Sequence, residues 1–411
     1  MTLEFDKVVS QVQRMGQALA ARSASMSERL ALAWERLSLL GDVEAVQQRI
    51  GLVRERDAGF RGAALLHEPA DRAYPLPPLP SRATILAADG SQVYPNAHAA
   101  ALYYLINVGV FIYRHGADDL PTPLTEPHLV YTDDMLHDEN GHLITNAAVN
   151  ARRTVQELAT LVRVVREQGH GEGPLLALLD GPLLFWAGKD VPDGKQLQTE
   201  YLGWLVYLHD LHANGPQGER QPICLAGYVD RPSSAFLIGL LHLMSLAPDD
   251  VRETALKTNG DLEGLTDQPL LFKLLKPGER SALLVQQSPQ NKRYHDKDPK
   301  YEIACFYLNV SANPPYHLAR VEVPMWVARE PELVNAVHAL IYDQCQLMWR
   351  YPYALTRADE LAVVRNHERV QLNDLIEIEL RRHEQMVAQS EKLESKVVRH
   401  GRTRYDRRKK L

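Results

Sequence analysis

Two apolar runs that each end in aspartate and glycine constrain the fold of this chain more than any other feature. The run ILAAD ends at Asp89, the run LALLD ends at Asp180, and a glycine follows in both cases. Short, fully apolar runs bounded by turn residues are typical of strands that are buried on both faces. Because Asp-Gly is a common turn dipeptide, we expect each aspartate to stand where a buried strand ends in a turn.

The segments around these runs predict an α/β fold. LYYLINVGVFIYR is rich in aromatic and β-branched residues and predicts a neighbouring strand, and HLVYTDDML is a third, shorter candidate. A helix is expected over about residues 146–168, where Val155, Leu158 and Val162 recur at helical spacing. A second helix (about 196–212) and the strands ICLAGYVD, YEIACFYLNVS and HLARVEVPMWVA follow. Strands in succession, followed by alternating helices and strands, indicate a mixed sheet flanked by helices.

A proline-rich segment divides the chain. Residues 1 to about 68 have helical spacing, and YPLPPLPSR then brings four prolines, which exclude a helix. We therefore expect an N-terminal helical segment (1–73), a joint (74–82), a core (83–375) and a C-terminal helix with a basic tail (376–411).

The charge is unevenly distributed along the chain. The net charge is −6, but the tail KVVRHGRTRYDRRKKL holds eight lysines and arginines against one aspartate. Such a tail is either a solvated terminus or an arm that binds nucleic acid phosphates and displaces their counterions.

The remaining composition indicates a cytoplasmic protein. No signal peptide is visible at the start, and no apolar stretch reaches the roughly 18 residues that a membrane helix needs. Cys224, Cys305 and Cys345 are odd in number and stand in apolar segments, so we expect buried free thiols.

Carboxylates are the candidate chemical groups. If the strands that end at Asp89 and Asp180 are neighbours, two carboxylates come within a few ångströms, which a divalent cation makes tolerable. Oxygen ligands favour Mg²⁺ or Mn²⁺ over zinc. The alternative is that each Asp-Gly is only a turn. Glu157 is either a third ligand from the helix or an exposed i,i+4 partner of Arg153.

A further carboxylate stands in YPYALTRADELA, where Asp359 is expected in the first turns of a helix. The helix dipole favours a carboxylate there whatever its function. The chain has no G-x-x-x-x-G-K-[ST] loop, which argues against ATP hydrolysis by the chain itself. It also has no G-x-S-x-G, H-E-x-x-H or paired C-x-x-C motif, so several familiar hydrolase mechanisms lack their parts.

In order and spacing, the motifs AADGS, LLDGPL, AGYVDRPSS, ARVEVP and YPYALTRAD resemble the NurA family of DNA-repair nucleases. The resemblance extends from about residue 80 to residue 375. It implies an RNase H-like core, a homodimer, and a requirement for Mn²⁺ or Mg²⁺. It also implies a partner, the hexameric DNA-translocating ATPase HerA, with which the family resects the ends of double-strand breaks.

The resemblance also assigns residues. Asp89 matches the carboxylate of the family's D-G-S motif, Asp180 the second strand-end aspartate, and Glu157 the helix glutamate between them. Tyr351 matches the tyrosine of the pattern Y-P-x-x-L-x-x-A-H. The chain departs from that pattern at the histidine, whose position is held by Asp359.

The implied function is a two-metal DNA nuclease that works as an exonuclease and also cuts single strands. Asp89, Asp180, Glu157 and Asp359 would be the metal ligands, and Tyr351 would orient a phosphate oxygen or pack. One alternative is an assembly subunit that binds the ATPase and DNA without cleaving, because the fourth ligand is altered. Another is an unrelated phosphoesterase acting on a small molecule.

Overall fold

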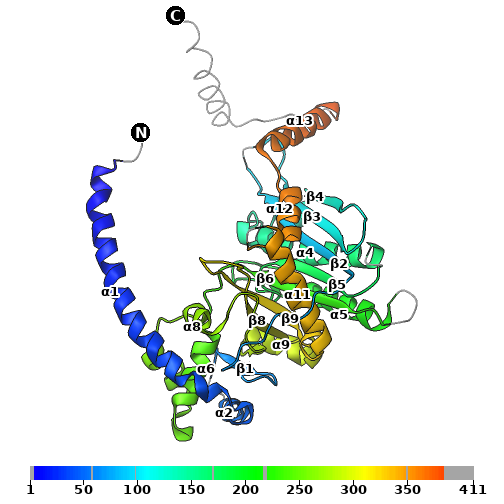
Figure 1. Cartoon of the computed structure of the whole chain (residues 1–411). Helices are drawn as coiled ribbons and strands as arrows, with labels where there is room; N and C mark the ends of the chain where they lie inside the picture. The colour runs from blue at the N-terminus through cyan, green and yellow to red at the C-terminus, as the bar shows by residue number, and fades with distance from the viewer. Residues whose placement is uncertain are drawn as a thin grey trace, which may run out of the picture.

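The computed structural model describes residues 4–56, 59–97, 99–168, 171–215, 220–348 and 350–383. Its centre is a nine-stranded mixed sheet with the order β1-β7-β8-β9-β6-β5-β2-β3-β4 (Figure 1). The strands are β1 (Ala63–Leu65), β2 (Ala83–Val93), β3 (Tyr104–His115), β4 (Thr122–Val130), β5 (Leu175–Asp180), β6 (Ile223–Val229), β7 (Leu284–Gln286), β8 (Ile303–Asn309) and β9 (Leu318–Pro324).

Helices cover both faces of the sheet and extend the chain at both ends (Figure 1). The α-helices are α1 (Asp6–Arg36), α2 (Val43–Glu55), α3 (Asp133–Leu136), α4 (Asn146–Gln168), α5 (Gly194–Asn214), α6 (Phe236–Ser245), α7 (Glu253–Leu256), α8 (Asp267–Leu274), α9 (Pro289–Lys297), α10 (Met325–Ala328), α11 (Pro331–Leu347), α12 (Tyr353–Ala362) and α13 (Asn366–Arg382).

The strand pairing confirms the expected mixed sheet. β2, β3 and β4 follow one another antiparallel, whereas β5 and β6 run parallel to β2. Each parallel connection contains a helix, α4 before β5 and α5 before β6. β9 then pairs antiparallel with β6 and extends the sheet towards β1. The carboxyl ends of β2, β5 and β6 therefore lie on the same side of the sheet, and this row of strand ends is called the sheet edge below.

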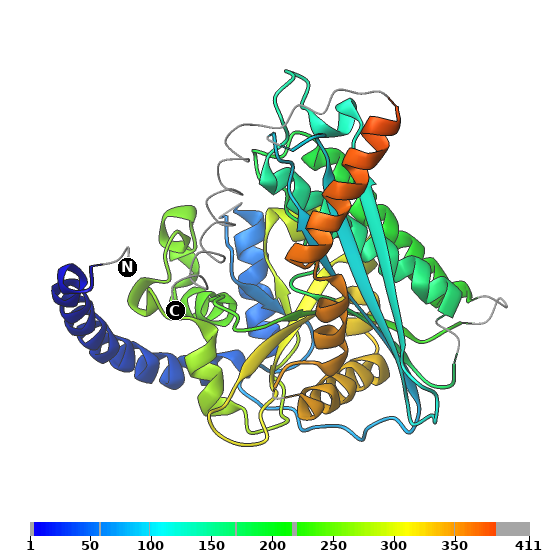
Figure 2. The ribbon, with the colours of Figure 1, turned by 90° about the horizontal axis from the view of Figure 1, so that it is seen from above.

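Two glycines bring helices close to opposite faces of β2 and β3. A Cβ on Gly90 would lie 2.6 Å from a carboxylate oxygen of Glu157 on α4. A Cβ on Gly109 would lie 2.4 Å from the carbonyl oxygen of Ala358 on α12. Since Gly109 is aligned with Asp89, and neighbours in a strand point to opposite faces, α12 lies on the face of Asp89 and α4 on the face of Gly90. In Figure 2, α12 crosses the long strands β2 and β3.

Several local expectations are wrong at their boundaries. β2 does not end at Asp89 but continues to Val93, because β3 pairs with it along its whole length. Residues 63–65 form β1, the outermost strand of the sheet beside β7, although helix was expected to about residue 68. The segment HLVYTDDML is divided between β4 and α3. The helical spacing that runs from about residue 356 towards the basic tail also predicts one continuous helix, but the structure has two helices there, α12 and α13.

Other expectations are confirmed. α4 has the predicted bounds, and Val155, Leu158 and Val162 on its stripe are buried. The three cysteines are buried free thiols. In the described part of the chain, no helix is long and apolar enough to cross a membrane. The basic tail, residues 396–411, lies outside the described residues.

Candidate active site

Strand register places Asp89 beside Asp180. Ala88 on β2 is aligned with Leu179 on the parallel strand β5, so the next residue of each strand is one of the two aspartates. Adjacent strands lie about 4.8 Å apart, and aligned residues point to the same face. β5 ends at Asp180, and Gly181 turns the chain away with a φ of +94°. β2 continues past this point, which leaves the two aspartates at an open edge of the sheet.

Glu157 approaches the same edge from α4. Its side chain is buried, and Oε1 lies 3.0 Å from Nε of Arg153. The i,i+4 pair considered from the sequence therefore exists, but its carboxylate is not exposed. The approach requires Gly90, because any side chain at that position would occupy the place of the Glu157 carboxylate. Arg153 also donates a hydrogen bond of 2.8 Å to Gln92 on β2, which fixes the guanidinium over the strand.

Tyr351 holds Asp180. Its phenolic hydroxyl donates a 2.8 Å hydrogen bond to Oδ1 of Asp180. The Tyr351 ring packs edge-on against Tyr228, with ring centroids 5.3 Å apart, and the Tyr228 hydroxyl donates to the carbonyl oxygen of Arg350. Arg350 has a φ of +76°, a conformation that is uncommon for residues other than glycine. Burial, and then the charge of Asp180, raise the pKa of Tyr351, so the hydroxyl keeps its proton.

Asp359 is exposed and lies in the last turn of α12, not in the first turns of a helix. α12 begins at Tyr353, directly after Pro352, so the expected stabilisation of Asp359 by the helix dipole is wrong. Side chains of β2 and β3 hold this end of the helix. Ser91 and Asn107 both donate hydrogen bonds to the carbonyl oxygen of Ala362.

Burial and neighbouring negative charges raise the pKa values of these carboxylates. Burial raises the pKa of Asp89 to about 6, the Gly90 N–H opposes this rise, and the charges of Asp180 and Asp359 add to it. The pKa of Asp180 is also raised, mainly by burial. Burial raises the pKa of Glu157 to about 8 against the attraction of Arg153, and the charges of Asp89 and Asp180 contribute. The edge therefore carries more negative charge than the nearby arginine neutralises.

This donor set fits a hard divalent cation in its chemistry. All candidate ligands are carboxylate oxygens, which Mg²⁺ and Mn²⁺ accept. Burial, and then neighbouring negative charges, raise the pKa values of Asp89 and Glu157, and a bound cation would oppose both effects. Within the described residues, however, no three histidine, cysteine, aspartate or glutamate side chains are arranged so that they could hold one ion.

Asp230 is a candidate that the sequence reasoning did not single out. It follows β6, the next parallel strand, and its charge raises the pKa of Asp180. Its carboxylate pairs with His317. The signal was present, because LAGYVD is a third apolar run that ends in aspartate, but no glycine follows it.

Comparison with known proteins places this geometry in a family. The family model described as NurA domain matches residues 83–364. The crystal structure of the NurA nuclease from Sulfolobus solfataricus is similar, with a TM-score of 0.51 at 10% identity, over 92% of this chain and 98% of that one.

Two other solved structures are more distant. The catalytic domain of human endonuclease V has a TM-score of 0.33 at 14% identity, over 80% of this chain and 98% of that one. Drosophila Piwi has a TM-score of 0.28 at 13% identity, over 68% of this chain and 29% of that one. No curated protein matches the sequence. The expected RNase H-like α/β fold with flanking helices is confirmed.

The raised pKa of Glu157 predicts how stability depends on pH without metal. The folded-state pKa of about 8 exceeds the value of about 4.3 in an unfolded chain. Between these values the folded state binds more protons, so this group makes the free energy of unfolding fall as the pH rises. Glu157→Gln removes the titration, and the variant should gain stability relative to wild type from about pH 5 to about pH 9.

Urea denaturation in EDTA across this pH range measures the effect. Glu28→Gln, at an exposed position of α1, is the matched control and should follow the wild-type curve. A constant difference between Glu157→Gln and wild type at every pH would contradict the prediction.

Proposed function

The chain belongs to the NurA family of nucleases, and on that premise we propose that it hydrolyses DNA phosphodiester bonds with divalent cations. One observation supports this proposal above the others. Strand register places Asp89 next to Asp180 at the sheet edge, where the charge of Asp180 helps to raise the pKa of Asp89. A protein gains nothing in stability from such a pair, whereas a bound Mn²⁺ or Mg²⁺ would compensate both charges.

Four carboxylates would hold two cations in this proposal. Asp89, Asp180, Glu157 and Asp359 would be the ligands. When bound, such a pair of cations would supply an activated water and stabilise the charge on the leaving 3′ oxygen. Asp230 is a further carboxylate at the same edge.

The chain's own groups position these carboxylates. Tyr351 keeps its proton and donates a hydrogen bond to Asp180, which orients that carboxylate, and its ring packs on Tyr228. Arg153 stabilises the ionised form of Glu157 within a buried environment. We also propose that cleavage depends on access to a strand and not on base sequence, because no base-reading motif is apparent.

Asp89→Asn and Asp180→Asn test the site. Each variant removes one charge at nearly constant shape, and each should lower the Mn²⁺-dependent degradation of linear DNA by about 100-fold or more. This follows because even outer partners of metal ligands cost 10- to 100-fold on substitution. The expected effect is on rate, not on folding.

Asp249→Asn is the matched control, because Asp249 is exposed on a short helix away from the sheet edge. Thermal melting in EDTA verifies that all variants fold. If a folded Asp89→Asn variant degrades DNA at the wild-type rate, the assignment of Asp89 is wrong.

Asp359 gives a second, metal-specific prediction. A carboxylate suits Mg²⁺ as well as Mn²⁺, whereas an imidazole nitrogen favours softer transition ions. Asp359→Ala should be nearly inactive, while Asp359→His should stay active and shift its preference towards Mn²⁺. Initial rates over a range of each metal concentration measure this. Glu360→Ala, on the neighbouring exposed position, is the control. Full activity of Asp359→Ala in both metals would remove Asp359 from the ligand set.

We further propose that the chain works as a homodimer with a HerA-type hexameric ATPase in resecting DNA ends. The family resemblance supports this, together with the absence of a nucleotide-binding loop in the sequence. The second candidate, a non-cleaving assembly subunit, is favoured by Asp359 at the position where the family has histidine. Sedimentation of the chain alone and with the ATPase should show a dimer and a larger complex. A monomer that forms no complex would refute the partner proposal.

A further inference from the structure

The loop that follows β5 exposes an aromatic side chain next to the candidate active site. Trp186 is 68% exposed, an unusual value for the largest side chain type. It lines a cavity of about 260 Å³ with Pro182, Leu184 and Phe236. Pro182 is only two residues from Asp180, a span of at most about 7 Å along the chain. One side of the cavity therefore lies close to Asp180 along the chain.

Buried contacts fix this loop, so the exposure of Trp186 is built into the fold. The N–H of Leu183 donates to Oε2 of Glu322 at 2.9 Å, and Glu322 is 2% exposed. The N–H of Phe185 donates to the Tyr294 hydroxyl at 2.9 Å. The Phe185 ring stacks on Tyr201, with ring centroids 5.3 Å apart. The residues on the inner side of the loop are anchored, and Trp186 is left on the outer side.

A second aromatic residue, Phe236, lines the same cavity. The N–H of Phe236, at the start of α6, donates to Oδ2 of the buried Asp267 at 2.8 Å. The guanidinium of Arg320 lies 5.2 Å from the centre of the Phe236 ring, and its charge is paired with Glu322. Neutral polar side chains complete the lining, namely Gln286, Ser288 and Gln290. Aromatic faces beside amides and hydroxyls suit a nucleobase better than an anion.

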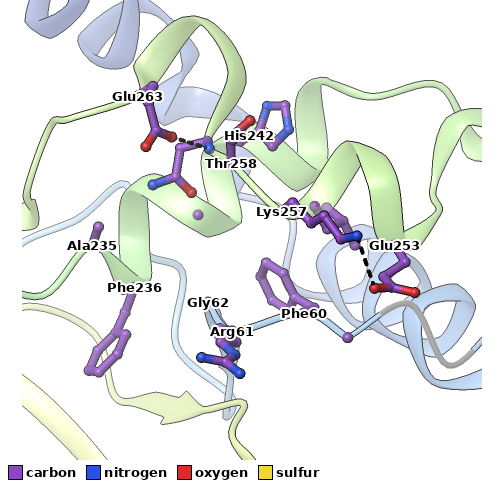
Figure 3. Close-up of a pocket in the computed structure, with 14 residues that line it drawn as sticks. Phe60, Arg61, Gly62, Ala235, Phe236, His242, Glu253, Lys257, Thr258 and Glu263 are labelled. Atoms are coloured by element: carbon purple, nitrogen blue, oxygen red, sulfur yellow. Dashed lines mark hydrogen bonds and ion pairs between the residues drawn. The ribbon is translucent and has the colours of Figure 1, made fainter.

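Phe236 also lines a larger cavity of about 530 Å³, so the two cavities share this residue. Figure 3 shows this second cavity, along which Phe60, Arg61 and Phe236 lie. Arg61 is exposed, and Lys257 forms only a surface ion pair with Glu253. The larger cavity therefore adds the Phe60 ring and two cationic side chains, beside the carboxylates of Glu253 and Glu263. Aromatic rings and cations together track a single strand through stacking and phosphate contacts.

We propose that Trp186 and Phe236 form a base-stacking path that guides single-stranded DNA to the carboxylates at the ends of β2 and β5. The proposal rests on the proposed nuclease function and names the form of the substrate. Every base has an aromatic face, so stacking on Trp186 is independent of sequence. A paired duplex hides those faces within its own stack, and this path is therefore specific for unpaired strands.

Binding without cleavage tests the path. The probe is a fluorescein-labelled oligothymidine, measured by anisotropy in EDTA, beside a blunt-ended hairpin duplex at the same salt concentration. Loss of one base–aromatic stack corresponds to an affinity decrease of about 5- to 150-fold. Trp186→Ala should show a decrease in this range for oligothymidine, and Trp186→Phe should restore most of the affinity. Hairpin binding should stay within about twofold of wild type for both variants.

Trp34→Ala is the matched control, because Trp34 on α1 is 40% exposed and lines neither cavity. Unchanged oligothymidine affinity of Trp186→Ala would overturn the proposal, as would an equal loss for oligothymidine and hairpin. The readout is separate from catalysis. A chain that binds through Trp186 and never cleaves refutes the nuclease proposal alone, and a chain that cleaves but binds equally well without Trp186 refutes the path alone.

Discussion

The candidate site depends on one constraint, the burial of several carboxylates at the shared edge of β2 and β5. Asp89, Asp180 and Glu157 all have raised pKa values, because burial opposes ionisation and the charges of neighbouring carboxylates add to this effect. Nothing in the hydrophobic core requires this arrangement, and it weakens the fold at neutral pH in the absence of a counter-charge. The fold tolerates it because the parallel strands are held by apolar residues on both faces, so register is fixed independently of the aspartates.

Close contact between helices and sheet brings the remaining groups to that edge. Gly90 lets the Glu157 carboxylate lie directly over β2, and Gly109 lets the backbone of α12 lie over β3. The two helices approach from opposite faces, so carboxylates from α4 and α12 reach one edge without sharing a layer. This is possible only where β2 extends beyond the end of β5, because a continuous sheet would separate the two faces.

How much of the fold and the candidate site could be predicted from the sequence depends on whether the relevant pattern is local or involves residues that are distant in the chain. Apolar runs and helical periodicity are local, and they predicted β5, β6 and α4 closely, together with the mixed sheet. Asp-Gly was expected to end β2, but pairing with β3 overrides a local turn preference. Asp359 was assigned to the start of a helix because the pattern did not reveal that α12 begins directly after Pro352.

The groups that the sequence did not reveal are those whose role depends on the neighbouring strands. Asp230 ends an apolar run like the other aspartates, yet its proximity to Asp180 follows only from the pairing of β5 with β6. Trp186 lies in an irregular loop, where no periodicity distinguishes an anchored residue from an exposed one. In both cases the decisive fact is which side of a fixed backbone a side chain occupies. A fold whose register is set by buried apolar strands can therefore vary its exposed edge, and Asp359 is an exposed residue near that edge.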